Sequence, residues 1–188
     1  MKELWIDVET TGLSPEKNFV HQIAGLIVID NDIKEQFDLR VRPPRGTILN
    51  KVALEIGNVT KEDLEGYPPH DQVYHDLIKM FSKFVDKYDK EDKFTFHGYN
   101  CHFDVGFMRT FFLANSDNYY GSWIWSNNVD VMVLASQHLR SERHKMKNFK
   151  LHTVMEYLKI QQQGVGAHDG MTDILGTRDI YLKLLNNV

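Results

Sequence analysis

Near its start the chain reads Leu4-Trp-Ile-Asp7-Val-Glu9-Thr-Thr-Gly-Leu13, and this stretch decides the fold that we expect. Apolar side chains occupy every second position, which is the period of a β-strand with two distinct faces. A turn at residues 10–13 ends the strand. Asp7 and Glu9 are two residues apart, so both carboxylates project from one face, roughly 6.5 Å apart along the chain. They can therefore bind the same ion or pair of ions.

Two more strands follow this one in the sequence. The apolar run at residues 23–29 and the segment 37–41 lie on either side of the polar turn Asn31-Asp32. Such a pattern is typical of strands joined by a tight turn. The first three strands are therefore expected to be antiparallel.

The rest of the chain alternates between helix and strand patterns. Short apolar segments at residues 94–96 and 129–134 indicate further strands, and Asn100 is suited to cap the helix that follows the first of them. Apolar residues recur at helical spacing over residues 73–88, 103–111, 151–158 and 174–185. Three early strands followed by alternating helices and strands predict an α/β fold with a mixed sheet.

The composition limits the class of protein. With 188 residues, 42% of them hydrophobic, the chain is expected to form one domain over residues 1–188. No apolar run approaches the roughly 20 residues that a membrane span needs. The single cysteine, Cys101, cannot form an internal disulfide. We therefore expect a cytoplasmic protein that has no membrane partner.

Two carboxylates on a strand that otherwise resembles core need a counterion. A buried pair of like charges is unfavourable. Oxygen ligands without a set of cysteines favour Mg²⁺ or Mn²⁺ over zinc. The alternative is a solvent-facing strand that carries two surface acids.

Other residues could complete such a site. Asp104 lies one turn after Asn100, where the helix dipole alone would also stabilise a carboxylate. His168 and Asp173 are five residues apart, which would place them about 140° apart on one continuous helix. They converge only if His168 lies in the loop before the last helix. Asp130 could lie behind a metal site, but a structural hydrogen bond explains it better.

Three motifs occur in order along the chain: Asp7-Val-Glu-Thr-Thr-Gly-Leu13, Tyr99-Asn-Cys-His-Phe-Asp104 and His168-Asp-Gly-Met-Thr-Asp173. In order and spacing they resemble the motifs of the DEDDh (DnaQ-like) family of 3′-to-5′ exonucleases. That family includes the proofreading subunits of bacterial replicative DNA polymerases. One departure is Gly170, where the family usually has alanine, and its backbone freedom could loosen His168.

The resemblance implies a ribonuclease-H-like fold, with three antiparallel strands, then two parallel strands, and helices on both faces. It also implies two divalent metal ions, Mg²⁺ or Mn²⁺, held by four carboxylates: Asp7, Glu9, Asp104 and Asp173. The ions would stabilise the attacking and leaving oxygens at the terminal phosphodiester. His168 would take the proton from the attacking water, since an imidazole with an unperturbed pKa of about 6.5 suits that task near neutral pH.

The resemblance also implies how the substrate is held. The residues expected to bind its 3′ end are Thr10, Thr11, Gly12, Leu13, Asn100 and Phe103. Leu13 would act as a wedge against the last base, although a turn leucine packed on the core explains its position equally well. The expected substrate is single-stranded nucleic acid, with DNA favoured over RNA. A DNA polymerase bound in trans is compatible with the sequence.

Two further segments have a composition that suits nucleic acid. Six basic residues fall within residues 140–150 together with one acid, although a solvated helix end has the same composition. The aromatic stretch at residues 119–125 could stack on bases, but core packing or a surface for a partner explains such a cluster better. Because the whole chain has a net charge of −4, any contact with phosphates must be local.

Two rival functions are compatible with the sequence. The first is a 3′-to-5′ exoribonuclease or oligoribonuclease-like enzyme with the same mechanism, because Trp5-Ile-Asp-Val-Glu9 with Thr11-Gly-Leu13 also resembles that branch. The second is a non-catalytic nucleic-acid-binding module of the same fold, which should have lost ligands that this chain keeps. DNA is favoured because Phe103-Asp104 resembles the proofreading branch.

Overall fold

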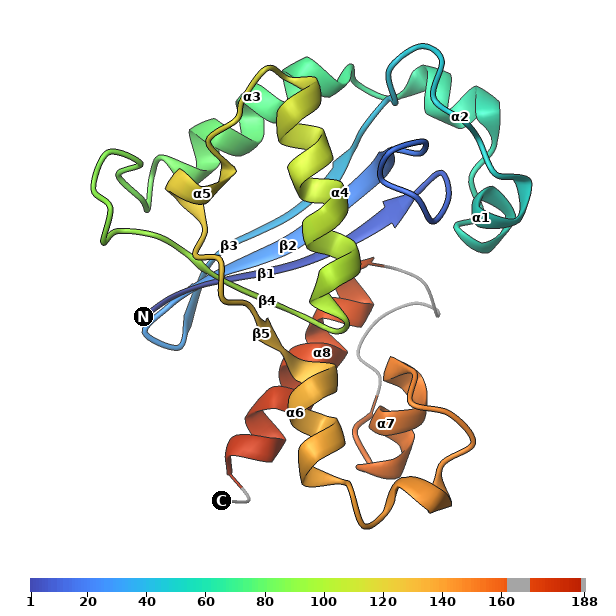
Figure 1. Ribbon diagram of the computed structural model, residues 1–188, viewed down its shortest axis with the longest axis vertical. Helices are drawn as coiled ribbons and strands as arrows, with labels where there is room; N and C mark the ends of the chain where they lie inside the picture. The colour runs from blue at the N-terminus through green and yellow to red at the C-terminus, as the bar shows by residue number, and fades with distance from the viewer. Residues whose placement is uncertain (162–169, 187–188) are drawn as a thin grey trace.

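A central β-sheet organises the computed structural model, which describes residues 1–161 and 170–186 (Figure 1). Within these residues the sheet has five strands in the order β3-β2-β1-β4-β5. The strands are β1 (Lys2–Thr10), β2 (Val20–Ile29), β3 (Asp32–Arg40), β4 (Thr95–Gly98) and β5 (Val129–Asp130). β1, β2 and β3 pair antiparallel, whereas β4 runs parallel to β1 and to β5. The predicted order of three antiparallel strands followed by two parallel strands is confirmed.

Helices cover both faces of this sheet (Figure 1). The described helices are α1 (Lys51–Ile56), α2 (Lys61–Gly66), α3 (His70–Phe81), α4 (Cys101–Ala114), α5 (Tyr120–Trp123), α6 (Val131–His138), α7 (Leu151–Tyr157) and α8 (Gly170–Leu185), and α1 has no buried residue. A 3₁₀ turn, η1 (Arg143–Lys145), precedes α7. None of the described helices is long and apolar enough to cross a membrane.

Two hydrophobic cores form, one on each face of the sheet. Leu4 and Ile6 of β1 pack with α3 and α4. Trp5 points to the other face, where it packs with Leu26 of β2 and with α6, α7 and α8. The alternation in β1 therefore separates two covered faces, and the strand is buried on both sides.

Two expected elements are shorter than their apolar patterns suggested. The segment 129–134 is a strand only over its first two residues, because the Asp130 carboxylate accepts a hydrogen bond from a backbone amide in the first turn of α6. The helix expected over residues 73–88 ends at Phe81, and Tyr88 is 86% exposed. Both predictions are wrong in extent, since apolar spacing does not determine where a backbone leaves the helix.

The aromatic stretch at residues 119–125 belongs mainly to a core. Tyr120 and Trp123 on α5 are buried among the residues that pack between α3 and α4, whereas Tyr119 is exposed. Core packing is confirmed for Tyr120 and Trp123.

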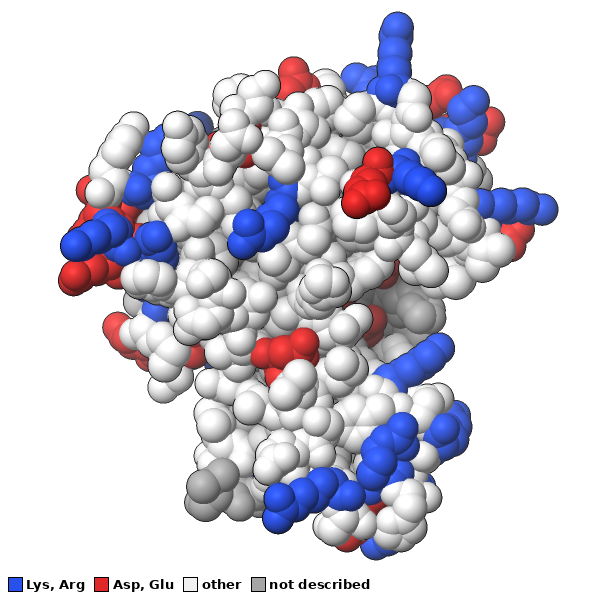
Figure 2. Space-filling model, viewed as in Figure 1, with Lys and Arg blue, Asp and Glu red and all other residues white. Residues whose placement is uncertain are grey.

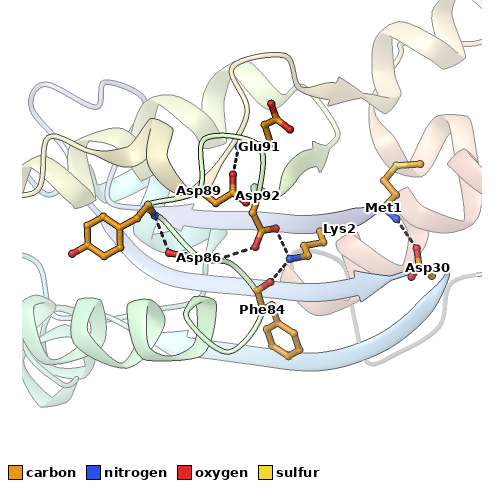
Figure 3. Close-up of polar contacts among 9 residues, drawn as sticks. Met1, Lys2, Asp30, Phe84, Asp86, Asp89, Glu91 and Asp92 are labelled. Atoms are coloured by element: carbon orange, nitrogen blue, oxygen red, sulfur yellow. Dashed lines mark hydrogen bonds and ion pairs between the residues drawn. The ribbon is translucent and has the colours of Figure 1, made fainter.

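Polar contacts hold the start of β1 against its surroundings (Figure 3). The Lys2 ammonium donates to the Phe84 carbonyl at 2.5 Å and pairs with the Asp92 carboxylate. The Met1 ammonium pairs with Asp30, after β2, at 2.5 Å. Lys2 and Asp92 are partly shielded from water, so their attraction is screened less than that of the exposed pair. The loop before β4 is thus attached to β1 at the end opposite to Asp7 and Glu9.

β2 contains a glycine that an aromatic ring of β3 covers. Gly25 lies opposite Phe37, and a Cβ built on Gly25 would lie 2.2 Å from the Phe37 ring. The ring occupies the space of the missing side chain, which explains why a glycine is tolerated in a central strand.

We expect Gly25→Ala to destabilise the protein by roughly 1–3 kcal/mol, because overpacking forces side chains and backbone to shift. Gly121→Ala is the matched control, since an added Cβ there meets no described atom within 4 Å. Urea denaturation would measure both free energies of unfolding. Equal stability of the two variants would contradict the close packing at Gly25.

Candidate active site

The candidate site lies where β1 extends beyond β4. β4 pairs with β1 only as far as Trp5, whereas β1 continues to Thr10. Beyond that point the amide of Val8 donates to Asp104 Oδ1 at 3.1 Å. Asp104 is buried in the first turn of α4. This hydrogen bond attaches α4 to the strand residue that lies between Asp7 and Glu9.

Asp7 and Glu9 share the face of β1 that α8 covers. They follow Trp5 at every second position, and Trp5 packs in the core that includes α8. A Cβ on Gly170, the first residue of α8, would lie 3.4 Å from Asp7 Oδ2 and 3.0 Å from Ala24 Cβ. The start of α8 therefore packs directly on the strand beside Asp7.

This close approach gives Gly170 a packing role. An alanine at this position would meet the side chain of Ala24 at a distance that requires one of them to shift. The glycine thus lets α8 lie close to β2. The loosening of His168 that we expected from this glycine stays a prediction, because His168 lies outside the described residues.

His152 lies beside the site, and the sequence did not reveal it. This histidine is on α7, and its Nε2 lies 3.6 Å from Oδ1 of Asp173. Asp173 is in the first turn of α8, so the contact joins two helices. Among nine histidines in the chain, no spacing distinguishes this one, because only tertiary packing brings α7 against α8.

Asp130 holds the helix that carries Asp104. Its carboxylate accepts hydrogen bonds from the amides of Asn100 at 3.1 Å and Cys101 at 2.9 Å, at the start of α4. It also accepts from the amide of Met132 at 3.0 Å. Asn100 occupies the predicted N-cap position, but its side chain caps no described amide, and Asp130 replaces it in that role. The interpretation of Asp130 as a structural residue is confirmed.

Burial raises the pKa of Asp104 from an ordinary value of 3.8 to about 8. Loss of hydration is the largest cause, the hydrogen bond from Val8 opposes it, and the negative charges of Asp130 and Glu9 add to it. The ionised form of Asp104 is therefore unfavourable near neutral pH without a counterion. A divalent cation beside this carboxylate would favour the ionised form.

The predicted metal ligands come from three elements that meet at one end of β1. They are Asp7 and Glu9 of β1, Asp104 of α4 and Asp173 of α8. Acidic side chains lie at a hollow between the regions of α4 and α7 (Figure 2). Within the described residues, no three His, Cys, Asp or Glu side chains are gathered into a metal-binding group. Their assignment as ligands therefore stays a prediction.

Hydrogen bonds hold the loop after β1 against Phe19 and Ile48. The Thr11 hydroxyl donates to the Ile48 carbonyl at 3.1 Å and accepts from the Phe19 amide at 3.1 Å. The Asn18 side chain donates to the same Ile48 carbonyl at 2.7 Å. A Cβ on Gly12 would lie 2.5 Å from the Asn18 side chain. A side chain at this position would therefore displace the Asn18 amide from its hydrogen bond to Ile48.

The residues predicted to bind the substrate differ in exposure. Thr10 and Thr11 are buried, so their side chains shape the loop from within. Leu13 is 83% exposed, and the alternative that it packs on the core is wrong. Asn100 is exposed and Phe103 is half-buried. Contact of these residues with a substrate stays a prediction.

Comparison with known proteins identifies the family. A family model described as exonuclease (RNase T) matches residues 4–181. The chain belongs to this exonuclease family. The match includes all three motifs, so their recognition as those of a DEDD-type 3′-to-5′ exonuclease is confirmed.

Relatives of this exonuclease include much longer proteins. It is 36% identical over 102 residues to DNA polymerase III PolC-type of Streptococcus pyogenes, which covers 54% of this chain and 6% of the polymerase. E. coli exonuclease I in complex with a dT13 oligonucleotide has a TM-score of 0.76 at 21% identity, over 100% of this chain and 41% of exonuclease I. Product-bound exonuclease I gives a TM-score of 0.76 at 21% identity, over 99% and 43% of the two chains. The predicted ribonuclease-H-like fold is confirmed.

In EDTA, the contribution of Asp104 to stability should fall as the pH rises from about 4 to about 8. Its folded-state pKa lies above the ordinary value, so the folded protein keeps a proton in this window that the unfolded chain has lost. Asp104→Asn keeps an oxygen that can accept from Val8 and removes this titration. The free energy of unfolding of the variant should therefore change less between these pH values, by an amount on the order of a few kcal/mol.

Urea denaturation at about pH 5 and about pH 8 would measure this difference. Asp76→Asn, an exposed acid on α3, serves as the control. The same pH dependence in Asp104→Asn as in the unmodified enzyme would contradict the raised pKa.

Proposed function

We propose that this exonuclease hydrolyses the terminal phosphodiester of single-stranded DNA from the 3′ end and releases nucleoside 5′-monophosphates. The observation that carries the proposal is the meeting of β1, α4 and α8 at one end of the sheet, each with an acid of the three motifs. Asp104 is bonded to the strand beside Glu9, and α8 packs against Asp7. The exposed Leu13 follows on the same segment and would act as a wedge against the last base. Residues 1–188 would act as one exonuclease domain.

Two divalent ions, Mg²⁺ or Mn²⁺, fit the proposed donors. The proposed ligands are Asp7, Glu9, Asp104 and Asp173, and all offer carboxylate oxygens, which these ions prefer. The raised pKa of Asp104 supports this assignment, since a cation would offset the cost of ionising a buried carboxyl. When bound, the ions would supply the positive charge that stabilises the attacking and leaving oxygens.

Two histidines have separate proposed roles. His168 would take the proton from the attacking water at an imidazole nitrogen, and this role rests on the third motif alone. His152, at 3.6 Å from Asp173, would hold that carboxylate in position on α8. The first acts on the reacting water and the second acts through another residue.

The structures of exonuclease I support single-stranded DNA as the substrate class. That enzyme was crystallised with dT13 and with dA16 oligonucleotides. Contacts to phosphate and sugar carry no direct sequence information, so we expect little base preference. A duplex end must fray before its last nucleotide reaches the site, and mismatched ends should be cut faster than paired ends.

Trp5 belongs to a stretch that resembles RNA-degrading enzymes, and packing in the core explains its presence here. Its ring stacks on His97 at 4.5 Å between centroids and meets Tyr181 edge-on at 5.4 Å, inside the core under α8. DNA stays the proposed substrate on the resemblance of Phe103-Asp104 to the proofreading branch. The similarity to a segment of a PolC-type polymerase supports a polymerase context, and a DNA polymerase bound in trans stays the proposed protein partner.

The test is digestion of single-stranded DNA, duplex DNA and RNA, each labelled at the 3′ or 5′ end, with Mg²⁺, Mn²⁺ or EDTA. We expect mononucleotides from the 3′ end of single-stranded DNA with either metal and no products in EDTA. Faster digestion of RNA would change the proposed substrate and leave the mechanism standing. Products released from the 5′ end would refute both.

Asp7→Ala should abolish hydrolysis while the protein stays folded, and no less stable without metal, because one of several repelling carboxylates is removed. Activity on end-labelled DNA and the melting temperature would be measured together. Asp76→Ala, on the exposed face of α3, should keep both properties. Loss of folding in Asp7→Ala would make this acid a structural residue instead.

His168→Ala should slow hydrolysis by about 10²- to 10⁴-fold and leave metal binding intact, because a general base accelerates only the proton transfer. Mn²⁺ binding by calorimetry and single-turnover cleavage would separate the two effects. A normal rate across the neutral range would remove His168 from the mechanism.

A further inference from the structure

An exposed basic segment leads into the candidate site. Residues 140–150, here named the basic tract, contain one acid, Glu142. The basic residues of the tract are all exposed: Arg140, Arg143, His144, Lys145, Lys147 and Lys150. In a chain with a net charge of −4, this is a strong local excess of positive charge.

The backbone of the basic tract is held in place. Met146 is buried in the core beneath α8, and Arg143 donates to its carbonyl at 3.1 Å. The Arg143 guanidinium also lies over the Phe149 ring, 5.2 Å from its centroid. The Tyr99 hydroxyl donates to the Phe149 carbonyl at 2.8 Å, which joins the tract to the segment between β4 and α4. The tract therefore presents its cations from a fixed framework.

Several of these cations are not neutralised by the protein. The Glu142 carboxylate is engaged by Lys145 and accepts from the Tyr157 hydroxyl at 2.7 Å. Within the part of the chain that the structure describes, Lys147 and Lys150 form no ion pair. Their charges are thus available to an external anion.

The basic tract lies next to the helix that contacts Asp173. α7 begins directly after Lys150, and His152 in its first turn lies 3.6 Å from Asp173. Lys and Arg side chains gather over η1 and α7, beside the hollow that separates this region from α4 (Figure 2). A strand whose end reached the acids could therefore continue over the tract.

We propose that the basic tract binds the sugar-phosphate backbone of a single DNA strand behind the nucleotide that is being removed. The inference rests on the proposed function and deepens it by naming the surface that holds the remaining strand. Exposed cations that contact phosphates supply affinity independent of sequence and release counterions, so binding weakens as salt rises. The tract supplies this affinity outside the acidic site.

The test compares Lys147→Gln/Lys150→Gln with the matched control Lys79→Gln/Lys90→Gln, which removes two exposed lysines from α3 and the loop after it. Binding of fluorescent dT15 would be followed by anisotropy in EDTA over a range of KCl concentrations. The tract variant should bind roughly three- to tenfold more weakly at low salt, and its slope of log Kd against log salt should decrease by about 0.7 per lost contact. The control should match the unmodified enzyme.

Hydrolysis of two substrate lengths completes the experiment. In the tract variant, kcat/KM should fall more on dT15 than on dT3, because dT3 has fewer phosphates left to contact the tract. An equal loss on both lengths would overturn the proposal, because the lysines would then support the site itself. An unchanged slope of log Kd against log salt in the tract variant would overturn the proposal as well. The tract would then not bind DNA phosphates, whatever other anionic partner it bound.

This design separates the inference from the proposed function. If the unmodified protein hydrolyses no DNA but its salt-dependent binding of dT15 is lost in the tract variant, the proposed function fails and the binding surface stands. If it hydrolyses dT15 and the tract variant binds as tightly as the control, only the inference fails.

Discussion

The hydrogen bond from the Val8 amide to Asp104 is the interaction on which the site depends. β4 is too short to pair with the far half of β1, and buried amides there must find acceptors elsewhere. Asp104 is one such acceptor, and in this role it brings the first turn of α4 against the strand. The cost is a buried carboxylate whose pKa is raised to about 8. The same side chain thus satisfies a backbone amide of β1 and places a buried carboxylate where a cation would stabilise its ionised form.

Asp130 complements this arrangement from β5. It accepts three amide hydrogen bonds and so holds the first turns of α4 and α6 in one place. Hydrogen bonds to an ionised carboxylate are stronger than those between neutral groups, which suits an anchor. The negative charge of Asp130 also raises the pKa of Asp104, Tyr99 and Cys101. The framework that positions Asp104 therefore contributes to the negative field into which a cation would bind.

The sequence predicted what is periodic or contiguous and missed what depends on contacts between elements. The alternation in β1 placed Asp7 and Glu9 on one face, and that face is the one α8 covers. In contrast, α1 escaped notice because its six residues include no buried side chain. His152 was missed for a related reason, since its contact with Asp173 joins two helices that the sequence places far from the other acids. The spacing of residues along the sequence also does not indicate that Asp130 accepts hydrogen bonds from the starts of two helices.

The charged residues of this protein are divided between an acidic site and a basic surface beside it. An acidic site repels a DNA strand until cations occupy it, so attraction has to come from elsewhere on the surface. The basic tract lies on one side of the acids, joined to them through α7, and the exposed Leu13 follows the acids on β1. A strand held by its backbone on the tract would present only its end to the acids if Leu13 acts as the proposed wedge. Removal of one terminal nucleotide at a time would then follow from the order of these three surfaces, without recognition of any base.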